Sequence, residues 1–94
     1  MESAVATVQI DDARVRVTEW AFEPNTETGF HTHGMDYVVV PMTSGTLTIA
    51  DADGVETDNA LIAGQSYARE TGVAHNVINR TNEKIVFVEV ELKA

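Results

Sequence analysis

Apolar and polar residues alternate along this chain in short runs that favour strands over helices. No long window has apolar residues at the i, i+3, i+4, i+7 spacing of an amphipathic helix. Runs rich in β-branched and aromatic residues are separated by turn residues and predict strands over 5–10, 14–22, 30–33, 37–41, 45–50, 55–57, 65–69, 73–79 and 84–92. Short strands at regular spacing predict an all-β sandwich or barrel.

Two irregularities qualify this pattern. Val15 and Val17 are apolar at odd positions, whereas Trp20 and Phe22 are apolar at even positions. One extra residue in a strand produces such a change, so we predict a bulge there. The segment 23–29 is predicted as a loop by its composition.

Some strands are apolar on both faces. Val38–Val40 and Ile85–Val88 have no polar residue at either parity. Such a strand lies between two layers or packs on a partner subunit. The large aromatic residues are expected in the core or at a dimer interface: Trp20, Phe22, Phe30 and Phe87.

Composition narrows the class of protein. The 94 residues suffice for one domain, 1–94, and 44% of them are apolar, as in ordinary globular domains. The absence of cysteine excludes disulfides and thiolate metal sites and suits the cytoplasm, where we expect the protein. We find neither a signal peptide at the first residues nor an apolar run long enough to span a membrane.

The charge balance argues against nucleic acid and anionic membranes as partners. There are 15 acidic residues and 6 basic residues, for a net charge of −9. Nucleic-acid binding relies on a basic patch, and the basic residues here are scattered among acids. We interpret the acidity as a solvated surface.

The three histidines are the candidate chemistry. His31 and His33 are two residues apart, so in a strand both imidazoles point to the same face, about 7 Å apart along the chain. Imidazole is a common ligand of divalent transition metals, and His75 is the only other histidine. The alternative is a set of hydrogen-bonded histidines without metal. We predict that the three meet inside one β-barrel and hold a single divalent ion.

Two segments of the chain resemble the two motifs of the cupin family. The matching residues are His31, His33 and Gly45 in the first motif and Gly64, Gly72, His75 and Asn79 in the second. Two differences are minor: Gly29 lies closer to His31 than the family's leading glycine, and Glu70 replaces a proline. The resemblance implies a jelly-roll barrel of two antiparallel sheets and a homodimer. The subgroup that the chain resembles most is labelled as beta-alanine degradation proteins. We take this label as an indication of related proteins and not of the substrate.

A more important difference is the missing glutamate that completes the family's three-histidine, one-glutamate site. By strand parity the matching position is Tyr37. Asp36 is the nearest carboxylate, and it would turn inward only if the strand had a bulge. The interval from Tyr37 to Gly45 has one more residue than the family pattern, so both alternatives stay open.

Several residues have a plain and a functional interpretation. Tyr37 either fills the barrel mouth or acts as a catalytic phenol beside the metal. Asp36 is either a solvated acid or a fourth ligand. Arg69 either extends into solvent or pairs with a substrate carboxylate. Asn79 is interpreted as a structural hydrogen bonder.

Three imidazoles without a carboxylate disfavour Mg²⁺ and Ca²⁺ and leave iron, zinc, nickel, copper or manganese. Such a face keeps coordination positions open, as catalytic sites do. The resemblance therefore implies a small metal-binding cupin, a non-haem metal-dependent oxygenase acting on a small polar metabolite. The alternative is a non-catalytic cupin that binds or senses a small ligand.

Overall fold

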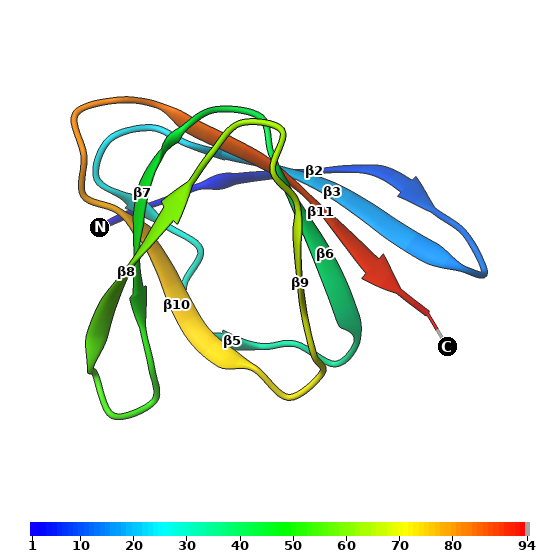
Figure 1. The fold of residues 1–94 in the computed structure, drawn as a ribbon. Coiled ribbons are helices and arrows are strands. Elements are labelled where there is room, and N and C mark those ends of the chain that lie inside the picture. Colours follow the sequence, from blue (N-terminus) through cyan, green and yellow to red (C-terminus); the bar gives the residue numbers. More distant parts are fainter. Residues whose placement is uncertain (94) are drawn as a thin grey trace.

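The computed structural model describes residues 1–93, and it contains strands and no helix within them (Figure 1). Within the same residues no helix is long and apolar enough to cross a membrane. The strands are β1 (Glu2–Ser3), β2 (Val5–Asp11), β3 (Val15–Phe22), β4 (Thr26–Glu27), β5 (His31–Thr32), β6 (Asp36–Pro41), β7 (Gly45–Ala50), β8 (Glu56–Leu61), β9 (Tyr67–Arg69), β10 (Ala74–Asn79) and β11 (Ile85–Leu92).

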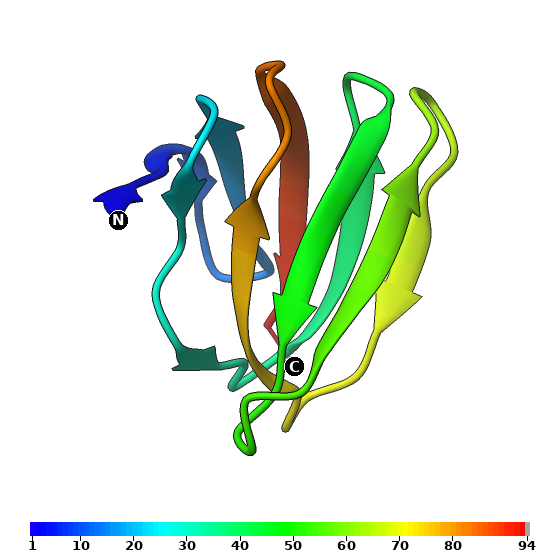
Figure 2. The same ribbon diagram turned by 90° about the vertical axis from the view of Figure 1, so that its left-hand side faces the viewer.

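The strands form two sheets that face each other (Figure 2). One sheet has the order β1-β4-β10-β7-β8, and β5 pairs with β10 beside this path. The other has the order β2-β3-β11-β6-β9. All pairs are antiparallel except that of β1 with β4. The predicted all-β jelly-roll architecture is therefore confirmed.

The core lies between the sheets and comes from inward-facing positions of β3, β6, β7, β8, β10 and β11. Its buried members are Phe22, Tyr37, Val39, Leu47, Leu61, Val77, Ile85 and Phe87. Phe22 and Phe87 pack with ring centroids 5.6 Å apart, and Trp20 packs against the cluster. Phe30 is 56% exposed and lies outside the core. A Cβ atom at Gly45 would lie 2.9 Å from Cδ1 of Ile85, so close packing of β7 explains this glycine.

The predicted bulge in the strand 14–22 is wrong. β3 pairs with β11 in one unbroken register from Val15 to Phe22, and the irregularity lies in β2, between Val8 and Ile10. The parity change has another cause: Val15 and Val17 point away from the barrel, where the sheet surface is also apolar.

Strand ends differ in places from the prediction. β5 is shorter than the segment 30–33, and the predicted loop 23–29 contains β4. β8 continues to Leu61 although Asp58 and Asn59 are polar. β8 lies at a sheet edge and pairs only with β7, so Asp58 faces solvent at little cost, whereas Asn59 is half-buried and lines a cavity.

Asn79 joins three segments at the end of β10, as its structural interpretation predicts. Its side chain is fully buried, and Nδ2 donates hydrogen bonds to the carbonyl oxygens of Phe22 and Glu83. Its Oδ1 accepts from the amide and the hydroxyl of Thr81. The amide group thus ties the end of β3 to the loop that leads into β11.

We predict that Asn79→Ala lowers the free energy of unfolding by about 2–4 kcal/mol, because several buried polar groups lose their partners. Urea unfolding measures the change. The exposed neighbour Asn82 is the control, and Asn82→Ala should change stability by less than about 0.5 kcal/mol. Equal effects of the two substitutions would contradict the structural role of Asn79.

Candidate metal centre

Strand pairing positions the histidines. β5 pairs with β10 so that His31 lies directly opposite His75. The backbone N–H of His33 donates to the carbonyl of Val73 at 2.8 Å, and its carbonyl accepts from the N–H of Gly72 at 2.8 Å. Gly72 has a φ of 95°, a conformation that favours glycine, and it allows the turn into β10. The three imidazoles therefore come from two neighbouring backbone segments locked to each other.

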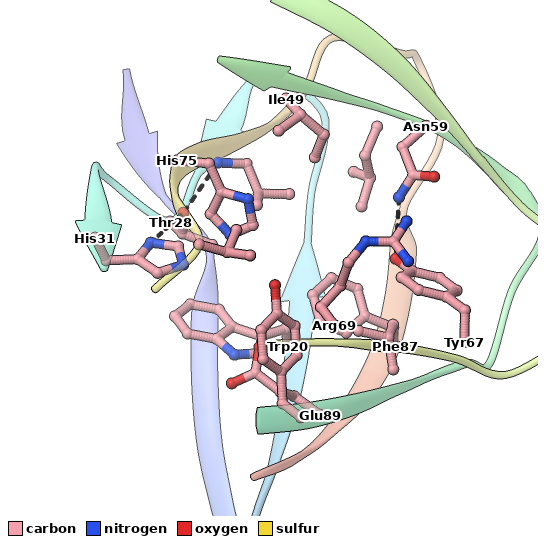
Figure 3. A pocket seen from close by; sticks show the side chains of 15 residues that line it. Trp20, Thr28, His31, Ile49, Asn59, Tyr67, Arg69, His75, Phe87 and Glu89 are labelled. Atoms are coloured by element: carbon pink, nitrogen blue, oxygen red, sulfur yellow. Dashed lines mark hydrogen bonds between the residues drawn. The ribbon is translucent and has the colours of Figure 1, made fainter. Parts of the chain in front are cut away.

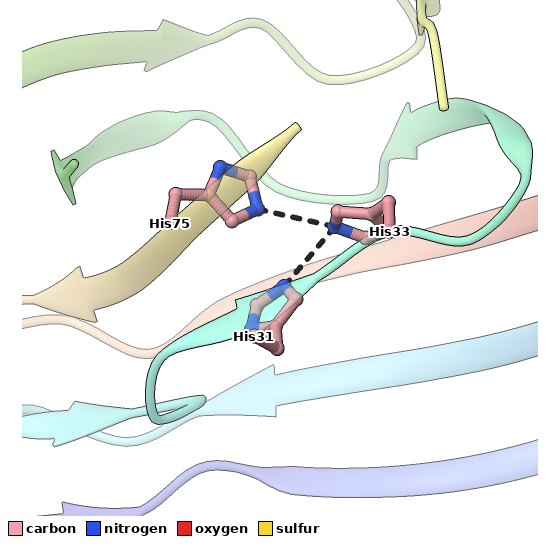
Figure 4. A group of neighbouring side chains, drawn as sticks. All are labelled: His31, His33 and His75. Carbon is pink, nitrogen blue, oxygen red and sulfur yellow. Dashed lines mark hydrogen bonds between the residues drawn. The ribbon is translucent and has the colours of Figure 1, made fainter. Parts of the chain in front are cut away.

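The three Nε2 atoms converge on one point (Figure 4). Nε2 of His33 lies 3.0 Å from that of His31 and 3.1 Å from that of His75. Two nitrogens bound to one ion at about 2.0–2.1 Å and at right angles are about 3 Å apart. The donor set and its spacing thus fit a single transition-metal ion, as the sequence predicts.

Neighbouring groups orient His31 for this role. Nδ1 of His31 lies 2.9 Å from the carbonyl oxygen of Gly29, which only accepts hydrogen bonds, so Nδ1 carries the proton. In the neutral ring with this tautomer, Nε2 has the lone pair, and it is directed at the cluster. Oδ1 of Asn76 accepts from the N–H of Gly29, and Nδ2 of Asn76 donates to Glu27 at 2.6 Å. Outer partners of this kind fix ring orientation in metal sites.

Burial keeps two of the histidines neutral. The pKa values of His33 and His75 are lowered to about 4. Desolvation by burial is the largest cause, and the nearby His31 is the second. A neutral imidazole is the form that binds metal ions. At these two residues protons therefore compete with a metal only when the pH approaches 4.

Tyr37 lies beside the cluster. Its ring stacks on that of His33, with centroids 3.9 Å apart and an interplanar angle of 20°. Burial, with a smaller contribution from Glu89, raises the pKa of Tyr37 to about 12. The phenol stays protonated near neutral pH, so it offers a hydrogen-bond donor and not a base.

Asp36 does not belong to the cluster. It is exposed, and its carboxylate accepts a hydrogen bond of 2.7 Å from the N–H of Thr71. β6 pairs with β11 without any register shift, so no bulge turns Asp36 inward. The additional residue before Gly45 lies in the turn between β6 and β7. The interpretation of Asp36 as a fourth ligand is corrected accordingly.

A cavity of about 220 Å³ opens beside His31 and His75 (Figure 3). Its middle is apolar, and its polar lining includes Arg69, Tyr67 and Asn59. The Arg69 guanidinium lies 4.5 Å from the centroid of the Tyr67 ring, and one of its nitrogens donates to the Ala68 carbonyl. Arg69 is exposed and also lines the cavity, so both of its interpretations stay open.

Two acids of β11 are site residues that the sequence analysis missed. Glu89 is only 8% exposed and lines the same cavity. Glu89, Glu91 and His33 each offer a ligand atom within 4.8 Å of the others. Desolvation raises the pKa of Glu89 to about 7, helped by the charge of Glu91. Both acids share the parity of Ile85 and Phe87, which are core residues in the structure, but Val86 and Val88 are apolar too, so the sequence alone does not show which face of this strand is inside.

Comparisons with known proteins define the class. The cupin domain family matches residues 18–91, and the chain belongs to this family. It is 56% identical over 90 residues to a Pseudomonas aeruginosa protein named beta-alanine degradation protein BauB, covering 96% of this chain and 94% of that one. The crystal structure of a cupin domain from Bordetella pertussis Tohama I is 54% identical with a TM-score of 0.95, covering 99% and 96% of the two chains.

A more distant structure shares the fold alone. The polyketide cyclase RemF from Streptomyces resistomycificus is 18% identical with a TM-score of 0.73, and 99% of this chain covers 69% of that one. The arrangement of the two sheets is therefore similar in proteins whose sequences differ widely.

The pKa of Glu89 predicts a pH dependence of stability. Its folded pKa of about 7 lies above the ordinary value of 4.5, so the folded chain holds more protons between these values. Stability from this group is full below pH 4.5 and is lost as the pH rises through 7. Wild-type protein should therefore lose stability relative to Glu89→Gln over that window, as measured by thermal unfolding of metal-free samples. Parallel pH profiles of the two proteins would show that the carboxyl group is not buried as described.

Proposed function

We propose that the chain is a cytoplasmic, metal-dependent cupin that acts on a small polar metabolite. The observation that carries this proposal is the convergence of three Nε2 atoms, 3.0 and 3.1 Å apart, at the wall of a cavity. His31, His33 and His75 are the proposed ligands of one ion. The neutral state of His33 and His75 supports this role.

The donor set favours particular metals. Nitrogen ligands without a carboxylate suit iron, zinc, nickel, copper or manganese better than Mg²⁺ or Ca²⁺. When bound, such an ion supplies a Lewis acid with open coordination positions beside the cavity. The chain's own residues then hold and orient the metabolite: Tyr37 offers a hydrogen-bond donor and Arg69 a positive charge.

The cavity supports a small substrate. Its volume of about 220 Å³ lies below the roughly 300 Å³ at which pockets for drug-sized molecules begin. The Pseudomonas aeruginosa relative is named for beta-alanine degradation, and beta-alanine is a small polar metabolite. Within this class we propose a non-haem metal-dependent oxygenase.

The alternative is a cupin that binds or senses a small ligand without chemistry. One observation favours it: Tyr37 stays protonated and Asp36 is remote, so neither of these residues serves as a base at the site. Dioxygen uptake separates the two functions. An oxygenase loaded with Fe²⁺ consumes dioxygen in step with loss of beta-alanine or a related metabolite, whereas a binding protein retains the ligand unchanged.

Metal binding is tested by His75→Ala. We predict about one Zn²⁺ or Fe²⁺ per chain in the wild-type protein and at least about a hundredfold weaker binding in the variant, because one of three ligands is lost. Thr32→Ala is the matched control, since Thr32 is exposed on the same β5 strand as His31. Elemental analysis and competition with a chelator measure the difference. Equal affinities of the two variants would remove the metal from the proposal.

We also propose a homodimer formed through the outer face of the sheet β2-β3-β11-β6-β9. The central strands of this face present apolar side chains: Val15, Val17, Ala21, Val38, Val40, Val86, Val88, Val90 and Leu92. Glu19 and Asp36 are the charged residues on the same strands and face. A continuous apolar surface of this kind is typical of interfaces between subunits.

Light scattering should give a mass of twice the 10.2 kDa chain. Val88 pairs with Val40 on one side and Glu19 on the other, at the middle of this face. Val88→Glu should therefore yield monomers, since the buried charge has no partner at a two-fold interface. Val55→Glu, at a residue that is 58% exposed outside the face, should leave the mass unchanged. A wild-type monomer at high concentration would refute the dimer.

A further inference from the structure

Two opposite charges line the cavity without neutralising each other. Glu89 comes from β11 and Arg69 from β9, and both border the cavity beside the histidines. Among the ion pairs of residues 1–93, none includes either residue. In Figure 3 Arg69 lies beside Asn59 and Tyr67, whereas Glu89 lies on the side of Trp20. The cavity therefore has a basic end at Arg69 and an acidic end at Glu89.

The basic end has the donors that a carboxylate requires. Nδ2 of Asn59 donates to the hydroxyl oxygen of Tyr67 at 3.0 Å, which leaves the hydroxyl's own proton for another acceptor. The Arg69 guanidinium lies over the Tyr67 ring and donates one N–H to the Ala68 carbonyl, so its remaining N–H groups are available. Guanidinium and hydroxyl donors together favour a carboxylate ligand.

The acidic end of the cavity is the mostly buried carboxyl group of Glu89, which lies close to His33 and Glu91. Glu89 is only 8% exposed, and within residues 1–93 no fully buried side-chain oxygen or nitrogen lacks a hydrogen-bond partner, so its carboxyl group opens to the cavity that it lines. Glu91 on the same strand differs, because Nη1 of Arg16 lies 3.8 Å from its carboxylate. Trp20 lines the cavity near Glu89, and an aromatic face also attracts cations. This end is suited to an amine or ammonium group.

We propose that the cavity binds a small amino carboxylate, with its carboxylate at Arg69 and Tyr67 and its amine at Glu89. The apolar middle of the cavity accommodates the short hydrocarbon part between the two ends; it is lined by Val39, Leu47, Ile49, Val77 and Phe87. This proposal names the substrate class of the proposed function. It rests on that function in one respect, namely that the metabolite binds in this same cavity.

Both charges also act on the residue that stacks on His33. Besides burial, which is the largest cause, Glu89 raises and Arg69 lowers the pKa of Tyr37. Arg69 also contributes to the lowered pKa of His75, after burial and the other two histidines. His31 and His75 line the same cavity as Arg69 and Glu89, so a ligand bound there lies beside the proposed metal centre.

The experiment compares ligands that differ in one charged end. The probes are three amino carboxylates: 3-aminopropanoate (beta-alanine), 4-aminobutanoate and 5-aminopentanoate. Two analogues lack one charged group: butanoate has no amine, and 1-aminobutane has no carboxylate. Binding to the full chain is measured by calorimetry and amide NMR shifts, with Zn²⁺ bound and after removal of metal by a chelator. We expect at least one amino carboxylate to bind about tenfold or more tightly than both single-ended analogues.

The variants assign each end. Glu89→Gln keeps the size of the side chain and should weaken the amino carboxylate about tenfold while changing butanoate by less than about twofold. Arg69→Gln should weaken both the amino carboxylate and butanoate, and Arg69 is exposed, so the fold is kept. Glu19→Gln and Arg80→Gln are matched controls on the outside of the barrel and should have no effect.

Other results overturn the inference. It is wrong if no amino carboxylate binds, if butanoate or 1-aminobutane binds equally well, or if Glu89→Gln leaves selectivity unchanged. If Glu89→Gln instead weakens Zn²⁺ and not the amino carboxylate, Glu89 is a metal ligand. The metal-free measurement separates this inference from the proposed function, which is tested by metal binding to the histidines and by dioxygen uptake.

Discussion

The antiparallel pairing of β5 with β10 is the constraint on which the metal centre depends. It sets His31 opposite His75, and the hydrogen bond from the N–H of His33 to Val73 holds the third imidazole beside them. A shift of one residue in this register would turn histidines to the opposite face. The short β5 strand is fixed mainly by backbone bonds to β10 and its preceding turn.

Desolvation inside the barrel affects the site in two opposite ways. It lowers the pKa values of His33 and His75 and raises that of Glu89, because in each case the charged form is disfavoured. The result is two neutral imidazoles, those of His33 and His75, next to an acid that accepts or releases a proton near neutral pH. The cavity therefore combines an apolar middle with imidazoles of the candidate metal centre and an ionisable carboxyl group.

Local pattern was sufficient for the fold class and for part of the site. Period-two alternation placed His31 and His33 on one face, and motif spacing matched His75 to the same cluster. The same alternation hid Glu89, because the preceding residues Ile85–Val88 are apolar at both parities and do not reveal which face is inside. The inner face of β11 depends on its pairing with β3 and β6, which is set by contacts far apart in sequence. The bulge was misplaced in β3 for the same reason, since an apolar outer face looks like a change of parity.

The central claim is that three imidazoles share one ion, and the chain's three histidines make it directly measurable. Nitrogen-15 NMR of histidine-labelled protein, titrated with Zn²⁺, reports on each ring nitrogen. The account predicts that the Nε2 signals of all three histidines move to metal-bound positions together and stop changing at one equivalent. A titration in which any one of them keeps its metal-free signal at saturation would contradict a shared three-histidine centre.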